Sequence, residues 1–197
     1  MLTNKQLHTV EEGLSFADFI DQWEKKNALP MTGLDPVARR YRFYSKYNIE
    51  RQRQVEALWR PSAGFRAAVE NTPAGIWLFI TDDWCVDSAY SLPLIQWGAQ
   101  QRPDVELRIL MKDDQPDIMD LFLTQGKRSI PKWVGLGRGG EVMFSWGPQP
   151  DAIRAIRQAL MDGGVEGRLV SQTTVEWYAN EGWLEVDKEL TTILSQI

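Results

Sequence analysis

The stretch ITDDWCVDSAYSLPLIQ, Ile80 to Gln96, decides the fold, because it leads from a strand pattern into a helix pattern at the only cysteine. The run that enters it, GIWLFIT (75–81), has the length and continuous apolar character of a buried strand. Beyond it, apolar residues continue at helical positions to about Gln101. Cys85 is therefore expected where a strand ends and a helix begins.

The downstream segments continue the alternation of strand and helix. The expected elements are a strand at VELRILM (105–111), a helix at QPDIMDLFLTQG (115–126), a hairpin of strands at KWVGLG (132–137) and EVMFSW (141–146), and a closing helix at DAIRAIRQALMD (151–162). Parallel strands joined by crossover helices, with a hairpin added to the same sheet, predict an α/β sandwich with helices on both faces.

Helical patterns flank this core on both sides. An amphipathic helix is expected over residues 13–27, a long helix from Asp35-Pro36 to about Trp59 and a short one over 64–70. Asn48 marks a point where the long helix could be interrupted. A helix pair broken near Gly182 is expected over 173–195. The predicted organisation is an N-terminal helical extension (1–70), an α/β domain (74–162) and a C-terminal helical extension (165–197).

Composition excludes several classes of protein. The chain has 197 residues, 25% charged and 43% hydrophobic, which is ordinary for a globular protein, and a net charge of −5. Neither nucleic acid nor a membrane is an expected partner, and no targeting segment is visible, so a cytoplasmic location is expected. One cysteine and one histidine permit no intramolecular disulfide and no Cys/His zinc site, so neither a metal nor a cofactor is expected.

The cysteine motif and its surroundings resemble the thioredoxin superfamily over residues 74–162. The shared features are Trp84-Cys85-x-x-Ser88 at the strand-to-helix junction, Pro93 within the helix, Ile130-Pro131 before the hairpin, and Gly140 and Gly147. The helical extensions resemble those of a bacterial thioredoxin-like subgroup with W-C-x-D-type sites. The resemblance implies a βαβαββα three-layer sandwich and a cis peptide bond before Pro131.

The resemblance also implies site roles and shows where this chain departs from the family. Cys85 would be the reactive thiol, Trp84 an aromatic wall beside it, and Ile130 and Pro131 the substrate-binding loop. Ser88 replaces the second cysteine, Asp87 stands in the motif where the family has proline, and Phe79 replaces a buried acid. Cycling between a dithiol and a disulfide is therefore excluded.

The sequence leaves the reactivity of Cys85 open. The N-terminus of a helix and a hydroxyl donor at Ser88 would lower the pKa of the thiol. The carboxylate of Asp87 would raise it, as would Asp82 and Asp83 if they face the sulfur. Burial as an inert thiol is the third alternative.

Two functions remain compatible with the sequence. The first is monothiol exchange, in which Cys85 attacks a disulfide-containing protein or the disulfide of a low-molecular-weight thiol, and an external thiol resolves the adduct. The second is a redox-inactive binding module that retains the thioredoxin groove. Whether the chain is an enzyme, its oligomeric state, and whether the N-terminal helices cover the site stay open.

The long helix near the N-terminus is basic. It carries Arg39, Arg40, Arg42, Lys46, Arg51, Arg53 and Arg60 against Glu50 and Glu56, with Tyr41, Tyr44 and Tyr47 interleaved. No nucleic-acid motif accompanies the charge. The favoured interpretation is an amphipathic helix whose tyrosines pack on the core while its arginines stay solvated or pair with acidic loops.

Overall fold

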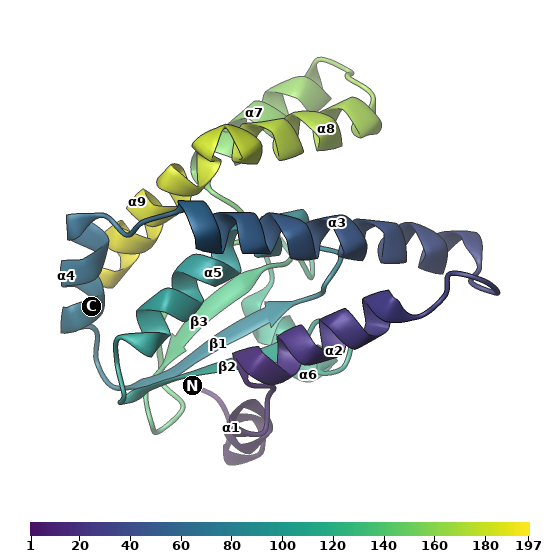
Figure 1. The fold of residues 1–197 in the computed structure, drawn as a ribbon. Coiled ribbons are helices and arrows are strands. Elements are labelled where there is room, and N and C mark those ends of the chain that lie inside the picture. The colour runs from purple at the N-terminus through teal and green to yellow at the C-terminus, as the bar shows by residue number, and fades with distance from the viewer.

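The computed structural model describes all residues, 1–197, and its centre is a four-stranded sheet (Figure 1). The strands are β1 (Gly75–Thr81), β2 (Val105–Met111), β3 (Lys132–Leu136) and β4 (Val142–Trp146). Their order is β2-β1-β3-β4, with β1 parallel to β2 and the other two pairs antiparallel. The predicted thioredoxin-like α/β fold is thereby confirmed.

Side chains of the central strand divide between two hydrophobic clusters, because successive residues of a strand point to opposite faces. Trp77 and Phe79 belong to the larger cluster, which includes α5 (Val86–Gln100). Ile76, Leu78 and Ile80 belong to the smaller one. All seven residues of β1 are buried, which explains why its sequence reads as a continuous apolar run.

Helices from both ends of the chain cover the sheet. Residues of α2 (Phe16–Ala28), α3 (Pro36–Leu58) and α4 (Ala63–Asn71) contribute to the larger cluster. The helix α3 starts as expected, since the carboxylate of Asp35 accepts hydrogen bonds from two free N–H groups of its first turn, at 2.8 and 3.0 Å. It runs without interruption through Asn48, and Figure 1 shows it alongside α5.

An additional helix, α1 (Asn4–Glu11), packs on the second face of the sheet and was not predicted. Its sequence is mostly polar, so it gives little periodic signal. A capping box between Thr3 and Gln6 starts it, and Val10 is fully buried. The N–H of Leu2 also donates to the carbonyl of Gly140, at 2.8 Å, which attaches the N-terminus to the hairpin turn.

The helix predicted over residues 115–126 is shorter than expected. The chain forms α6 (Pro116–Met119) and one 3₁₀ turn, η1 (Asp120–Phe122), and then leaves the helix. Arg128 donates two hydrogen bonds of 2.6 Å to Asp120, which closes a loop over the intervening residues. Gly126 lies in that loop at φ +75° instead of ending a helix.

The chain from Asp151 onward is helical, as predicted. It comprises α7 (Asp151–Asp162), α8 (Gly167–Trp177), the π-helical segment η2 (Tyr178–Gly182) and α9 (Trp183–Leu194). The predicted break near Gly182 is present, because Glu181 has a left-handed backbone with φ +63°. Figure 1 shows α7 and α8 projecting as a pair beyond the sheet, while α9 returns beside α4.

A buried carboxylate connects the C-terminal helix to the N-terminal ones. Asp187 of α9 accepts hydrogen bonds from the indole N–H of Trp59, at 3.2 Å, and the hydroxyl of Ser62, at 2.6 Å. The two extensions thus form one packed layer with α5. None of the helices combines the length and the apolar character needed to cross a bilayer.

Candidate functional site

Cys85 lies between β1 and α5, at the N-cap of the helix, as the sequence predicts. The peptide bond between Ile130 and Pro131 is cis, also as expected. The two features are in contact, because the Cys85 thiol donates to the carbonyl oxygen of Ile130 over 3.6 Å. The sulfur is nevertheless covered, and only 6% of the residue is exposed.

Burial dominates the chemistry of this thiol. It raises the pKa of Cys85 to about 12, from an ordinary value of 9.0, and the charge of Asp87 acts in the same direction. The hydroxyl of Ser88 and the backbone N–H groups at the start of α5 lower the pKa, as expected, but they are outweighed. Of the three alternatives that the sequence left open, the buried thiol is the one that the structure shows, because the helix terminus does not compensate for the lost solvation.

Ser88 lies behind the sulfur as part of a chain of polar groups. Its oxygen accepts a hydrogen bond of 2.6 Å from the hydroxyl of Thr81, and its own hydroxyl forms a hydrogen bond with the sulfur of Cys85. Ser88 is buried and does not line the cavity described below. Ser88 therefore contacts the thiol from the protein interior and not from the cavity.

Asp87 is held by a residue distant in the sequence. The hydroxyl of Tyr178, in η2, donates to its carboxylate over 2.9 Å. Burial raises the pKa of Asp87 to about 6, from 3.8, while the Tyr178 hydrogen bond and the charge of Arg157 act in the opposite direction. The ring of Tyr178 is fully buried and stacks on Tyr90, with centroids 4.5 Å apart. The C-terminal extension therefore shapes the cysteine motif directly.

Trp84 stands at the edge of the site between an aromatic ring and a cation. Tyr41 of α3 stacks on it, with ring centroids 4.8 Å apart, and Lys112 lies 5.6 Å from its ring centre. The prediction that the tyrosines of the basic helix pack on the core is wrong for two of them. Tyr44 is 43% and Tyr47 52% exposed, and both face the same cavity as Trp84.

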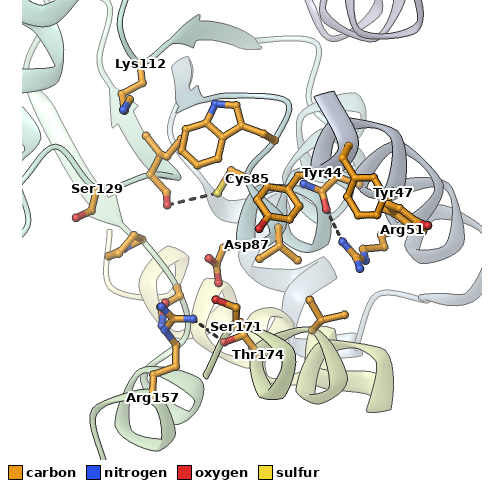
Figure 2. A pocket seen from close by; sticks show the side chains of 18 of the residues that line it. Tyr44, Tyr47, Arg51, Cys85, Asp87, Lys112, Ser129, Arg157, Ser171 and Thr174 are labelled. Carbon is orange, nitrogen blue, oxygen red and sulfur yellow. Dashed lines mark hydrogen bonds between the residues drawn. The ribbon is translucent and has the colours of Figure 1, made fainter. Parts of the chain in front are cut away.

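A cavity of about 560 Å³ opens beside the cysteine motif (Figure 2). Its walls are the middle of α3, the start of α5, the loop before Pro131, and the pair α7 and α8. Of the six predicted site residues, Trp84, Cys85, Asp87 and Ile130 line it. Pro131 is buried behind it, and its carbonyl leaves no room for a Cβ at Gly147, which has φ +111°.

Comparison with known proteins agrees with this geometry. A family model described as Thioredoxin matches residues 36–161, which is more than half of the chain. This chain belongs to the thioredoxin family. Its match includes α3, so the helix that walls the cavity is part of the family region. No curated protein sequence matches this thioredoxin-family chain at a significant level.

Two solved structures share the fold of this thioredoxin-family protein over its whole length. One is a protein of unknown function, PA1234 from Pseudomonas aeruginosa, with 17% identity, a TM-score of 0.60 and coverage of 100% of this chain and 99% of that one. The other is an HIV epitope scaffold, also 17% identical, with a TM-score of 0.63 and the same coverage. The helical extensions are therefore part of a fold that other proteins have.

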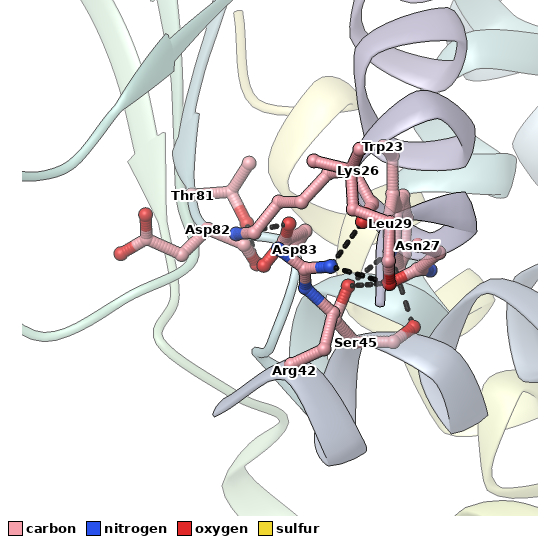
Figure 3. Close-up of polar contacts among 9 residues, drawn as sticks. All are labelled: Trp23, Lys26, Asn27, Leu29, Arg42, Ser45, Thr81, Asp82 and Asp83. Atoms are coloured by element: carbon pink, nitrogen blue, oxygen red, sulfur yellow. Dashed lines mark hydrogen bonds and ion pairs between the residues drawn. The ribbon is translucent and has the colours of Figure 1, made fainter. Parts of the chain in front are cut away.

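The loop that carries the cysteine is fixed by a polar cluster whose residues do not line the cavity (Figure 3). Asp83 is buried and forms an ion pair of 2.5 Å with Lys26 of α2. The carbonyl of Lys26 accepts a hydrogen bond from Arg42 of α3. Asp83 therefore connects the loop to α2. It does not contribute to the raised pKa of the Cys85 thiol.

Three residues at or beside the site were not identified from the sequence. Arg51 was counted among the solvated residues of a basic helix, and Arg157 and Tyr178 gave no signal in their own segments. Only the fold brings them beside residues 84–87. No group of three or more His, Cys, Asp or Glu side chains could hold a metal ion.

Proposed function

We propose that this thioredoxin-family chain is a binding protein that uses the groove beside the cis-proline loop and does not use Cys85 as a nucleophile. The observation that carries the proposal is the state of the thiol. It is buried, its pKa is raised to about 12, and its proton is donated to Ile130. Only the thiolate attacks disulfides, so a thiol in this state reacts slowly at neutral pH.

The cavity supports the binding role. It has the volume typical of small-molecule sites, and one wall is the loop that binds substrate in related folds. The N-terminal helices do not cover it, since α3 forms a side wall with its tyrosines exposed. The groove is therefore open while the sulfur is not.

Thiol reactivity tests the proposal. The reduced protein is mixed at pH 7.5 with Ellman's reagent and, separately, with glutathione disulfide. Since the pKa of the thiol is raised from 9.0 to about 12, we expect a reaction roughly a thousandfold slower than that of a free thiol. Protein unfolded in urea is the control and should react at the rate of a free thiol. Rapid formation of a mixed disulfide by the folded protein would overturn the proposal.

Monothiol exchange is the second candidate, because Cys85 still lines the cavity and touches the cis-proline loop. In this function the thiolate attacks a disulfide-containing protein or a low-molecular-weight disulfide, one thiolate leaves, and an external thiol later releases the adduct. If the chain performs monothiol exchange, we assign it to the bacterial thioredoxin-like subgroup with W-C-x-D-type sites, as a member with a single cysteine.

The variant Asp87→Asn discriminates between the two candidates. It removes the charge that raises the thiol pKa and leaves an oxygen for Tyr178. Monothiol exchange predicts that the wild type already forms a mixed disulfide with glutathione disulfide and that the variant does so about tenfold faster. Asp114→Asn, at an exposed position, is the matched control and should leave the rate unchanged.

A further inference from the structure

We propose that the cavity between α3, α7 and the cysteine motif binds a small organic anion with a flat ring. This inference rests on the proposed binding function and names its ligand class. It follows from three properties of the cavity: unpaired cations, hydrogen-bond donors without acceptors, and exposed aromatic rings.

The cations are Arg51 of α3 and Arg157 of α7, which line the cavity from opposite sides (Figure 2). Both are partly buried, and neither takes part in any ion pair of the molecule. Arg51 donates a hydrogen bond to Asn48 at 2.7 Å and also interacts with the hydroxyl of Tyr90, and Arg157 donates to Thr174 at 2.6 Å. The charge of Arg157 also acts on Asp87, but neither arginine forms an ion pair, so the two oriented guanidinium groups suit an anionic ligand.

The other charges around the cavity do not neutralise this pair. Lys112 and Arg128 also line it, but each already has an acidic partner, Asp113 at 3.4 Å and Asp120 at 2.6 Å. Asp87 is the only acidic residue of the lining. The cavity is thus cationic in a chain whose net charge is −5, and it would attract anions from solution.

Two donors in the lining have no acceptor within the protein. The side-chain N–H₂ of Asn48 is buried without a partner, although the residue is only 1% exposed. The backbone N–H of Ile130 also donates to no atom of the chain. Buried donors are normally satisfied, so both indicate an acceptor-bearing ligand in the cavity.

The aromatic contribution comes from α3. Tyr44 and Tyr47 lie at the cavity, and the ring centre of Tyr47 is 4.7 Å from that of Phe43. Phe43 is itself 51% exposed, which is unusual for so large an apolar ring. A flat ring on the ligand would cover these faces while its anionic group reaches the arginines.

The test uses two fluorescent probes with the same ring system. Anilinonaphthalene sulfonate is an anion with a flat naphthalene ring, and phenylnaphthylamine has the same rings without the sulfonate. We expect the sulfonate to bind the folded protein at one site and at least tenfold more tightly than the neutral probe. Equal affinity for the two probes would overturn the anion selectivity.

Variants locate the site. Arg51→Gln and Arg157→Gln should each weaken binding of the sulfonate about tenfold and leave the neutral probe unaffected. Arg157→Lys, which keeps the charge, should retain most of the affinity and shows whether loss in Arg157→Gln reflects charge or folding. Arg66→Gln is the matched control, since Arg66 lies over Trp97, outside the lining. Sulfonate binding that both glutamine variants leave intact would place the anion elsewhere and overturn the proposal.

The experiment separates this inference from the proposed function. A fast thiol reaction would refute the proposed function without changing these affinities. Loss of anion selectivity would refute only the proposed ligand class.

Discussion

At Cys85, burial and the charge of Asp87 act together on the thiol, and the helix terminus and Ser88 act against them. The same burial acts on Asp87, whose carboxylate is stabilised in the opposite direction by the Tyr178 hydroxyl, the charge of Arg157 and a backbone hydrogen bond. Both residues are thus held in an environment that favours the neutral form. A residue that resembles a catalytic nucleophile in sequence is a weak one in this setting.

The raised pKa of Asp87 predicts a pH-dependent stability. The folded protein binds this proton more tightly than the unfolded chain, because the pKa is about 6 when folded and 3.8 otherwise. The associated stability is fully present below pH 3.8 and is lost as the pH rises through about 6. The amide side chain of the variant Asp87→Asn cannot ionise. The free energy of unfolding of the variant, relative to that of the wild type, should therefore rise by up to about 3 kcal/mol from acidic to neutral pH.

Urea denaturation of both proteins at pH 4.5 and 7.5 measures about 2 kcal/mol of this change, because pH 4.5 already lies above 3.8. The neighbouring charged or titratable groups, Arg157, Tyr178 and Cys85, are the same in the two proteins. Asp82, whose pKa is also raised to about 7, contributes equally to both and cancels in the difference. Asp114→Asn is the control. A stability difference that is the same at both pH values would contradict the assigned environment of Asp87.

At the scale of elements, the loop between β1 and α5 is held from two sides. Tyr178 binds it from the C-terminal helices, and Lys26 binds it from α2 through Asp83. Asp83 is buried, and the ammonium group of Lys26 is the cation that pairs with its carboxylate. The N-terminal helices thus contribute to the shape of the site without closing it.

The variant Lys26→Met tests this connection. It leaves a buried carboxylate without its cation, and we expect it to lower the free energy of unfolding by about 3 kcal/mol. Adding Asp83→Asn to it should restore part of the loss, since the unpaired charge is then removed. Lys25→Met is the matched control, because Lys25 is exposed and pairs with exposed Asp21, and it should change little. Equal effects of the two methionine variants in chemical denaturation would show that the buried pair is unimportant.

At the scale of the whole molecule, the extensions and the sheet share one core. Residues of α2, α3, α4 and α9 belong to the same hydrophobic cluster as the central strand. The cavity is likewise shared, because α3 supplies Arg51, α7 supplies Arg157, and α8 supplies Thr174. The ligand specificity proposed above therefore belongs to the complete chain and not to the α/β domain alone.

Deletion of residues 165–197 tests the dependence of the core on the C-terminal extension. The deletion removes buried Tyr178, Trp183, Val186, Leu190 and Leu194. We expect the shortened chain to lose cooperative thermal unfolding, since these side chains cover α5 and α4. A chain ending at Ser195 is the control and should melt as the full chain does. Cooperative unfolding of the shortened chain at the wild-type temperature would show that the extension is dispensable.

The sequence indicated much of this architecture. Strand and helix periods predicted the sheet, α5, α7 and the break near Gly182, because these patterns record which face of each element is buried. The length of α6 and the presence of α1 were mispredicted. Both depend on contacts with other segments, the Asp120–Arg128 pair and the packing of Val10, which local patterns do not record.

The features of the candidate site likewise divide into those that follow from local sequence and those that depend on contacts between distant segments. From the sequence alone it follows that one thiol stands at the start of a helix, with Asp87 and Ser88 after it, and that no second thiol can resolve an adduct. The burial of this thiol, the contact of Tyr178 with Asp87, and the position of Arg51 and Arg157 at one cavity appear only in the folded chain. Solvation and electrostatic fields depend on distance in space, and the groups that set them here are far apart along the chain.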